Sequence, residues 1–267
     1  MKPAAFDYAR PATLDEAVAM LASTPEAMVL AGGQTLGPML NLRLARPALL
    51  VDITRIAELA SCEATGEEIV IGATVTHAAI EDRRITDPAN GFLARVAHGI
   101  AYRAVRTRGT IGGSLANADP AADWLASLTA LGAELTIAAK DGARRRVALA
   151  RFVLGALEND LAHGELIIAV HVPKFSRNAR FGFHKICRKQ GEFADAIGVA
   201  ALDPDRARHR LVASTAAGAP IVLESAARPD AASIDRRLTG AGFAGDDIDL
   251  ELAAAALRRA LAAAEAR

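Results

Sequence analysis

Two short glycine-containing segments hold the residues best suited to chemistry in this chain. The first is AGGQTL at residues 31–36, and the second is TIGGSLANADPAAD at residues 110–123. Each places a glycine pair after an apolar or β-branched stretch and before an expected helix. Glycine has no Cβ, so backbone N–H groups at such a turn can come close to a negatively charged ligand. Two such segments in one chain predict a single extended anionic cofactor held from both sides.

The residue types around the glycines supply hydrogen-bond donors for a diphosphate. Backbone N–H groups and polar side chains would converge on its charged oxygens. The expected donors are Gly32, Gly33, Gln34 and Thr35 in the first segment and Thr110, Gly112, Gly113 and Ser114 in the second. Asp123 lies in the first turn of the following helix, where its carboxylate is suited to accept hydrogen bonds from ribityl or ribose hydroxyls.

Other interpretations of the glycine pairs stay open at this point. Either pair alone is typical of a plain tight turn. Neither segment matches the G-x-G-x-x-G fingerprint of a Rossmann NAD site, although Asp52 stands about twenty residues beyond the first pair, where such a site has its acid. A Rossmann site would leave the second segment without a role.

The N-terminal residues predict a helix followed by a small β-α-β unit. Thr13 and Glu16 form a capping box, and the apolar spacing after it predicts a helix to Ser23. The remaining elements are expected to be a strand at 27–30, a helix after Pro38 that ends before Pro47, and a strand at 49–53. The first glycine pair lies at the turn after the first strand.

The middle of the chain mixes strands and helices. Asp119-Pro120 resembles an N-cap acid followed by proline at the first helical position, and Asp141-Gly142 is a strong hairpin signal. The expected elements are a strand at 69–71, a short helix from Thr76 through Glu81, a helix at about 86–104, a helix from Asp119 to Gly132, strands at 134–139 and 146–149, and a strand at 165–172.

The pattern changes at about residue 175. Three apolar stretches with short polar connections predict an antiparallel meander, and the alanine-rich stretch at 248–266 predicts a helix over one face of that sheet. The fold class expected for the whole chain is α+β. We expect three parts, with residues 1–53 and 54–174 as two subdomains and residues 175–267 as a C-terminal α+β domain.

Composition excludes several classes of function. Lys+Arg and Asp+Glu both number 31, which gives no indication of nucleic acid as a partner. No apolar run reaches the roughly 18–20 residues that a membrane span needs, and residues 1–17 lack the apolar core of a secretory signal. Cys62 and Cys187 form no C-x-x-C pattern, which argues against zinc or an iron–sulfur cluster and favours the cytoplasm.

The histidines show no spacing typical of metal ligands. They stand at positions 77, 98, 163, 171, 184 and 209, and we expect surface or hydrogen-bonded structural roles for them. We therefore predict no metal site in this chain. No acid–base dyad or nucleophile triad stands near the glycine segments, so we predict no catalytic side chain either.

The two glycine segments and their flanks resemble a known family. AGGQTLGPMLNLRLARPALLVDI and TRGTIGGSLANADPAADW closely resemble the two flavin-binding signatures of the medium, FAD-binding subunits of molybdenum hydroxylases, the carbon monoxide dehydrogenase and xanthine dehydrogenase type of enzyme. FGFHKICRKQGEFADAIGVA and LVASTAAGAPIVLE resemble later segments of the same family. The resemblance implies a two-subdomain FAD-binding domain of the vanillyl-alcohol-oxidase (PCMH) type, followed by the separate C-terminal domain.

The resemblance also implies a set of FAD-binding residues. On the pyrophosphate and adenosine side these are Val29, Leu30, Ala31, Gly32, Gly33, Gln34, Thr35 and Leu36. On the diphosphate and ribityl side they are Thr110, Gly112, Gly113 and Ser114, with Ala116 and Asn117 close by and Asp123 on the hydroxyls. Ile167 resembles a strand residue that packs on the cofactor. Lys185 resembles a basic residue beside the flavin ring, where a cation would stabilise the reduced flavin.

The function implied by the resemblance is electron transfer within a larger oxidoreductase. A large subunit with a molybdenum cofactor would hydroxylate the substrate, and two [2Fe–2S] clusters in a small subunit would pass electrons to FAD here and then to an external acceptor. The implied assembly is a dimer of heterotrimers. The alternatives are a stand-alone FAD-dependent oxidoreductase of the same fold and a scaffold that has lost FAD.

The sequence departs from the family pattern at identifiable places. Phe193 stands near a position where the family often has a tyrosine beside the flavin, and Ser114 stands where many members have Asn or Asp. The chain also ends in an alanine-rich stretch instead of the usual acidic and Tyr-Arg-Arg ending.

Overall fold

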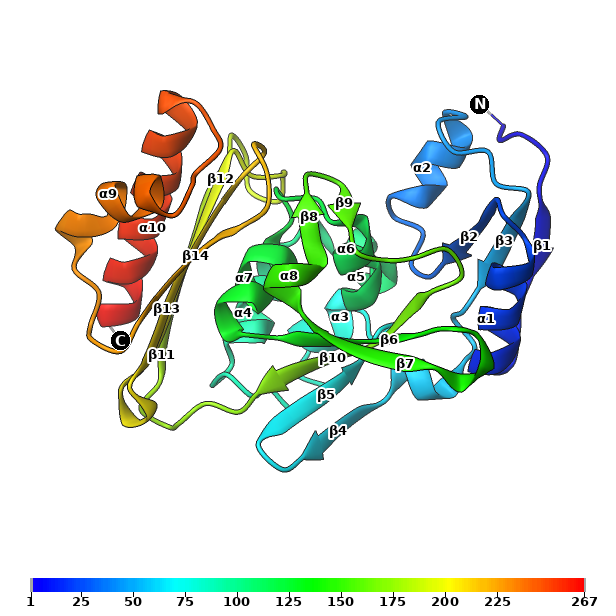
Figure 1. The fold of residues 1–267 in the computed structure, drawn as a ribbon, viewed down its shortest axis with the longest axis horizontal. Coiled ribbons are helices and arrows are strands. Elements are labelled where there is room, and N and C mark those ends of the chain that lie inside the picture. The colour runs from blue at the N-terminus through cyan, green and yellow to red at the C-terminus, as the bar shows by residue number, and fades with distance from the viewer. Residues whose placement is uncertain (1, 267) are drawn as a thin grey trace.

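Three larger β-sheets, with helices between them, are arranged along the long axis of the molecule, and a fourth sheet has only two strands (Figure 1). The structure is a computed structural model that describes residues 2–266. A small N-terminal sheet lies at one end, a five-stranded sheet with its helices lies in the middle, and a four-stranded sheet covered by the last helix lies at the other end (Figure 1). The fold is α+β, as predicted.

The N-terminal part is a parallel sheet beside a capped helix. Its strands are β1 (Asp7–Ala9), β3 (Leu49–Asp52) and β2 (Ala27–Leu30), in that order. Helix α1 (Leu14–Ser23) begins with the predicted capping box, since Thr13 Oγ1 accepts from Glu16 N and the Glu16 carboxylate accepts from Thr13 N. Strand β1 was not predicted. Helix α2 (Leu36–Asn41) is shorter than expected. It ends there because Arg43 takes a left-handed φ of 59° and Leu44 N donates a hydrogen bond to Met39 O.

The middle sheet is antiparallel. Its order is β4 (Cys62–Thr65), β5 (Glu68–Gly72), β10 (Leu166–Pro173), β6 (Glu134–Ala138) and β7 (Arg144–Ala148). The pairing of β6 with β7 around Asp141-Gly142 confirms the predicted hairpin. A short 3₁₀ turn, Ala57–Ala60, links the N-terminal sheet to β4, and the two-stranded hairpin of β8 (Val153–Gly155) and β9 (Glu158–Asn159) follows helix α8 (Leu149–Phe152).

The helices of the middle part lie between its sheet and the C-terminal sheet (Figure 1). They are α3 (His77–Glu81), α4 (Phe92–Gly99), α5 (Arg103–Arg108), α6 (Ile111–Asn117) and α7 (Asp123–Leu131). Thr76 caps α3, and Gly132 ends α7 in a left-handed conformation, as predicted.

Two helix predictions in this part were wrong. The single helix expected at 86–104 is two helices, because Ala101 takes a left-handed φ of 41° between them. Helix α7 begins at Asp123 and not at Asp119, because the Asp119 carboxylate accepts from Ala121 N in a local turn. The carbonyl of Pro120 accepts a hydrogen bond from Ser214 Oγ at 2.7 Å, so this segment is held against the C-terminal sheet.

The C-terminal part is the predicted antiparallel meander with its helix. Strands β11 (Arg180–Ile186), β12 (Ala196–Asp203), β13 (Arg208–Thr215) and β14 (Ile221–Ser225) pair in sequence order. After a short 3₁₀ turn come α9 (Ile234–Gly240) and α10 (Asp247–Glu265), and α10 covers the outer face of the sheet (Figure 1). A Cβ on Gly182 would lie 1.8 Å from the carbonyl oxygen of Ala260, so the alanine-rich helix and the sheet touch through their backbones.

The buried cores run across the three parts. One cluster joins α1 and β3 to Leu166 and Ile168 of β10. The largest cluster joins Trp124 and its neighbours in α7 to Ile197 and Val199 of β12. The division at residues 53 and 174 stays a prediction, since hydrophobic packing is continuous across both positions.

Candidate cofactor site

A cleft of about 570 Å³ opens between the N-terminal sheet and the helices of the middle part. This volume is in the range of small-molecule and cofactor sites. Its lining includes these residues expected from the sequence: Val29, Ala31, Gly32, Gly33, Gln34, Thr35, Leu36, Thr110, Gly112, Gly113, Ser114, Ala116, Asn117, Asp123 and Ile167. Leu30 and Lys185 are not part of the lining. The fold therefore brings the two glycine segments to one site.

The first glycine segment touches, through its backbone, the two residues that precede the second segment. A Cβ on Gly32 would lie 2.1 Å from Arg108 O and 2.8 Å from Gly109 Cα, so no other residue fits there without moving the backbone. Gly33 has a left-handed φ of 68°, which a residue with a side chain adopts at a cost in free energy. These two glycines let the turn after β2 rest directly on the end of α5.

The two segments differ in their supply of free donors. The backbone amides of Gly33, Gln34 and Thr35 donate no hydrogen bond within residues 2–266. The amides of the second segment are already engaged: Gly112 N donates to Ala73 O at 2.9 Å and Gly113 N to Thr110 Oγ1 at 3.1 Å. The second segment is thus a capped helix start rather than an open loop, and the first segment offers the free amides.

Asp123 and Lys185 form a buried ion pair beside the cleft. Lys185 Nζ lies 3.0 Å from each carboxylate oxygen of Asp123. The Lys185 side chain is 10% exposed and the Asp123 side chain is 6% exposed. Burial raises the pKa of the Asp123 carboxyl, and Lys185 offsets part of this effect. The predicted hydroxyl acceptor thus has a cation as its protein partner, and Lys185 borders the site through Asp123.

Asp52, the acid of the Rossmann alternative, has a structural role. Its carboxylate accepts hydrogen bonds from the Tyr8 hydroxyl and from Thr54 N and Oγ1, and Arg10 Nε lies 3.3 Å away. Burial raises the pKa of the Asp52 carboxyl, and these hydrogen bonds outweigh that effect and lower it overall. Asp52 ties β1 to the end of β3 and is not part of the cleft lining. The Rossmann interpretation is therefore not supported.

Several lining residues lay outside the sequence prediction. The buried ones include His77 and Trp124, and Trp124 Nε1 donates to His77 Nδ1 at 2.9 Å. Tyr102, which was also not predicted, is 72% exposed and borders the cleft. Phe193, which the sequence analysis had noted near the family's flavin-side tyrosine, is 67% exposed and borders it too. No local sequence signal singles out His77, because its hydrogen-bond partner lies 47 residues further along the chain.

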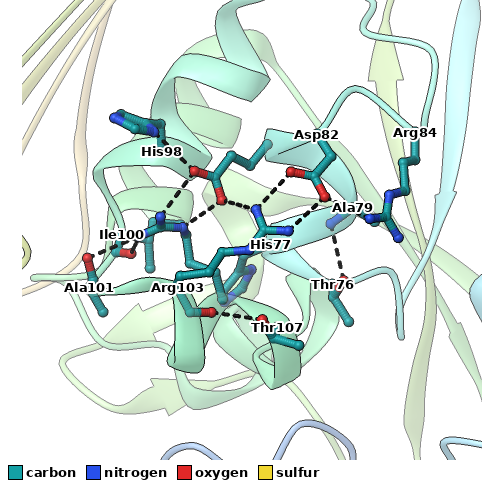
Figure 2. Close-up of polar contacts among 12 residues, drawn as sticks. Thr76, His77, Ala79, Asp82, Arg84, His98, Ile100, Ala101, Arg103 and Thr107 are labelled. Atoms are coloured by element: carbon teal, nitrogen blue, oxygen red, sulfur yellow. Dashed lines mark hydrogen bonds and ion pairs between the residues drawn. The ribbon is translucent and has the colours of Figure 1, made fainter.

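A charged network supports the wall of the cleft at Ile100–Tyr102 (Figure 2). Arg106 donates from Nε and Nη2 to Glu81 at 2.7 and 3.0 Å, and from Nη1 to the carbonyls of Ile100 and Ala101 at 2.8 and 3.1 Å. His98 and Arg103 also contact the Glu81 carboxylate. The Arg106 guanidinium lowers the pKa of Glu81 to about 2. This network holds the left-handed turn at Ala101, which separates α4 from α5.

Comparison with known proteins gives the family. A model described as the FAD binding domain in molybdopterin dehydrogenase matches residues 4–175. This chain belongs to that family. The match covers both glycine segments and all of the cleft lining except Gly191, Glu192 and Phe193, and it confirms the resemblance seen in the sequence.

The relatives include a curated subunit and solved structures. The chain is 37% identical over 195 residues to the caffeine dehydrogenase subunit beta of Pseudomonas sp. strain CBB1, which covers 73% of this chain and 66% of that subunit. The structure of carbon monoxide dehydrogenase from Hydrogenophaga pseudoflava matches with a TM-score of 0.88 and 30% identity, over 100% of this chain and 99% of that chain. Quinoline 2-oxidoreductase from Pseudomonas putida 86 matches with a TM-score of 0.84 and 30% identity, over 100% and 99%. The C-terminal meander is thus shared in fold.

FAD fits the residues of the cleft. Its diphosphate needs hydrogen-bond donors, and the first glycine segment presents amides that no protein group uses. The apolar side chains of Val29, Leu36 and Ile167 offer a surface for aromatic rings. Within residues 2–266 no three His, Cys, Asp or Glu side chains gather to hold a metal ion, and no helix is long and apolar enough to cross a membrane.

Proposed function

We propose that this chain is the electron-transferring FAD subunit of a molybdenum hydroxylase complex. Electrons would come from the [2Fe–2S] clusters of a small partner subunit and leave to an external acceptor. A large partner subunit would carry the molybdenum cofactor and the substrate. The proposal rests chiefly on one observation. In a chain that belongs to an FAD-binding family, the two glycine segments line one cleft of about 570 Å³.

The chain's own contribution is binding and orientation. FAD supplies the redox chemistry when it is bound, since it exchanges electrons singly or in pairs. We assign the diphosphate to the amides of Gly33, Gln34 and Thr35, which are free within residues 2–266. Ala31, Gly32 and Leu36 would border the same half of the cofactor, and Leu30 would act from behind them. No side chain of this chain is needed as an acid, base or nucleophile.

The second segment would shape the opposite wall. Thr110 and Gly113 fix the start of α6, and Gly112 lets this start lie against Ala73. We assign Ser114, Ala116 and Asn117 to contacts near the ribityl chain and Val29 and Ile167 to packing on the cofactor. Asp123 would accept from cofactor hydroxyls while it holds Lys185, whose charge would favour the electron-rich form of the cofactor.

The proposed assembly contains this chain, a large subunit and a small subunit, as a dimer of heterotrimers. The names of the relatives, which are subunits or medium chains of dehydrogenases, support a complex of several subunits, and the dimer of heterotrimers is our proposal. The free cysteines Cys62 and Cys187 are compatible with a reducing compartment, and we place the complex in the cytoplasm.

The decisive experiment combines a spectrum with a co-purification. The protein, expressed with the genes next to its own, should carry acid-releasable FAD at near one per chain and co-purify with an iron–sulfur subunit and a molybdenum subunit. Protein that stays colourless after incubation with FAD would refute the cofactor assignment. A yellow protein that purifies alone and reduces an acceptor with its own substrate would favour the stand-alone oxidoreductase instead.

A further inference from the structure

His77 is a buried polar side chain whose second ring nitrogen is unused by the protein. The residue is 6% exposed and belongs to the cleft lining. Trp124 Nε1 donates to its Nδ1 at 2.9 Å, while its Nε2 has no hydrogen-bond partner within residues 2–266. Nε2 is not among the fully enclosed side-chain atoms that lack a partner, so a ligand in the cleft can reach this nitrogen.

The indole hydrogen bond fixes which nitrogen of His77 carries the proton. Indole N–H can only donate, so Nδ1 must accept and the neutral ring carries its hydrogen on Nε2. Burial, with a smaller effect of the nearby Arg106, lowers the pKa of His77 to about 4. His77 is therefore a neutral ring with one free N–H donor at physiological pH.

The backbone around His77 places this donor where the glycine segments meet. His77 N donates to Gly109 O at 2.9 Å, and Thr76 and Thr110 form an antiparallel bridge beside it. A Cβ on Gly109 would lie 2.7 Å from His77 Nε2, and one on Gly32 would lie 2.8 Å from Gly109 Cα. The imidazole thus occupies the space that the missing side chain of Gly109 leaves, next to Gly32.

We infer that His77 is a cofactor-binding residue that donates from Nε2–H to a diphosphate oxygen of FAD. The inference rests on the proposed function, in which FAD occupies this cleft. The first glycine segment offers free amide donors to the cleft, whereas the amides of Gly112 and Gly113 in the second segment already donate to protein groups. A neutral imidazole on the second wall would supply the donor that those amides do not. Trp124 is then a positioning residue for His77.

Two substitutions separate hydrogen bonding from packing. His77→Phe keeps a planar ring without a donor, whereas His77→Gln keeps both an acceptor for Trp124 and a donor for the ligand. A hydrogen bond to a charged group contributes about 1.5–3 kcal/mol, so the FAD Kd of His77→Phe should rise about 10- to 100-fold. The FAD Kd of His77→Gln should stay within about threefold of the parent on the same affinity scale.

The measurement is a titration of apoprotein with FAD. Binding is monitored as the quenching of the fluorescence of Trp124, the only tryptophan in the sequence. His163→Gln is the matched control, because His163 is exposed and is not part of the cleft lining. A folded His77→Phe protein with the parental FAD Kd would overturn the inference. If the unaltered protein binds no FAD, the proposed function fails and this inference fails with it.

A spectroscopic readout avoids reliance on the Phe variant. In the unaltered protein with ¹⁵N-labelled histidine, the Nε2 resonance that disappears in His77→Gln should shift when FAD is added. An Nε2 resonance that FAD leaves in place would show that His77 does not bind the diphosphate.

Discussion

Lys185 Nζ lies 3.0 Å from both carboxylate oxygens of Asp123, across the junction between the C-terminal sheet and the cofactor cleft. Lys185 lies in β11 and Asp123 begins α7, so the pair joins two elements that are 62 residues apart in sequence. Because both side chains are buried, each charge depends on the other. The cleft is thereby tied to the C-terminal sheet, which contributes little to its lining.

Removing one partner of this pair should destabilise the protein strongly. Asp123→Asn leaves the Lys185 charge buried and unpaired, and such a change typically costs about 3–5 kcal/mol of unfolding free energy. The double variant Asp123→Asn/Lys185→Met should recover much of that loss. Urea unfolding of the three proteins tests this. The exposed pair of Arg258 with Asp235 is the control, and Arg258→Gln should cost less than about 1 kcal/mol. Equal losses for the single and double variants would contradict the prediction.

Gly113→Val should abolish FAD binding with the C-terminal domain intact. Gly113 lines the cleft, and its Cβ would lie 2.8 Å from Thr110 Oγ1, the cap of α6. The larger side chain would displace the cap and enter the space that we assign to the cofactor. Flavin content after reconstitution is the measurement. Gly37→Val is the control, since a Cβ there meets nothing within 4 Å. Full flavin occupancy in Gly113→Val would refute our placement of the cofactor.

Arg106 should matter more than Arg103, although both contact Glu81. Arg106→Gln leaves the Glu81 carboxylate without its main partner and frees the carbonyls of Ile100 and Ala101, whereas Arg103 is 50% exposed and contacts neither carbonyl. We expect a loss of about 3 kcal/mol in unfolding free energy for Arg106→Gln and less than about 1 kcal/mol for Arg103→Gln. Denaturant unfolding with and without FAD measures both losses. Similar losses would mean that the carbonyl contacts contribute little.

Stability should fall as the pH drops from about 6.5 to about 4. The folded-state pKa of His77 is about 4, below the ordinary value of 6.5, so the unfolded chain binds more protons in that window. The contribution of His77 to this loss is at most about 3 kcal/mol. Burial, with Arg259 nearby, also lowers the pKa of His184, so the difference between the parent and His77→Gln isolates the effect of His77. Parallel curves of unfolding free energy for the two proteins would disprove this assignment.

A second loss should follow at lower pH. The pKa of Glu81 lies at about 2 in the folded protein, below its ordinary value of 4.5, so its contribution fades as the pH falls through that window. His77→Gln should retain this second loss. The pKa values of Asp52, Glu68, Asp82 and Glu165 are lowered as well, so the difference in unfolding free energy between the parent and Glu81→Gln, measured against pH, isolates the contribution of Glu81.

The parts of the fold that depend on residues adjacent in the sequence could be predicted from local sequence patterns. The capping box at Thr13, the hairpin at Asp141-Gly142 and the helix end at Gly132 each need only a few consecutive residues, and each was predicted correctly. The parts of the cleft lining that the two glycine segments supply could also be predicted, from the resemblance to a family.

Distant contacts decided the rest. The left-handed turn at Ala101 depends on Arg106, and the start of α7 depends on a turn at Asp119 and on Ser214, so a periodicity of apolar residues could not show them. Strand β1 of the N-terminal sheet pairs with β3, which lies about forty residues further along the chain, and β1 has little apolar character of its own. His77 could not be singled out, because its partner Trp124 is 47 residues away.

The contact between Gly32 and Arg108 has a consequence for how a ligand enters. This contact is made by main-chain atoms and needs no ligand to form, so the two backbone segments are already in place before a cofactor binds. A cofactor then meets a preorganised site, and little of its binding free energy goes into ordering the chain. Exchange must proceed through the open side of the cleft, past the exposed rings of Tyr102 and Phe193. The chain should therefore release and reload its cofactor without unfolding.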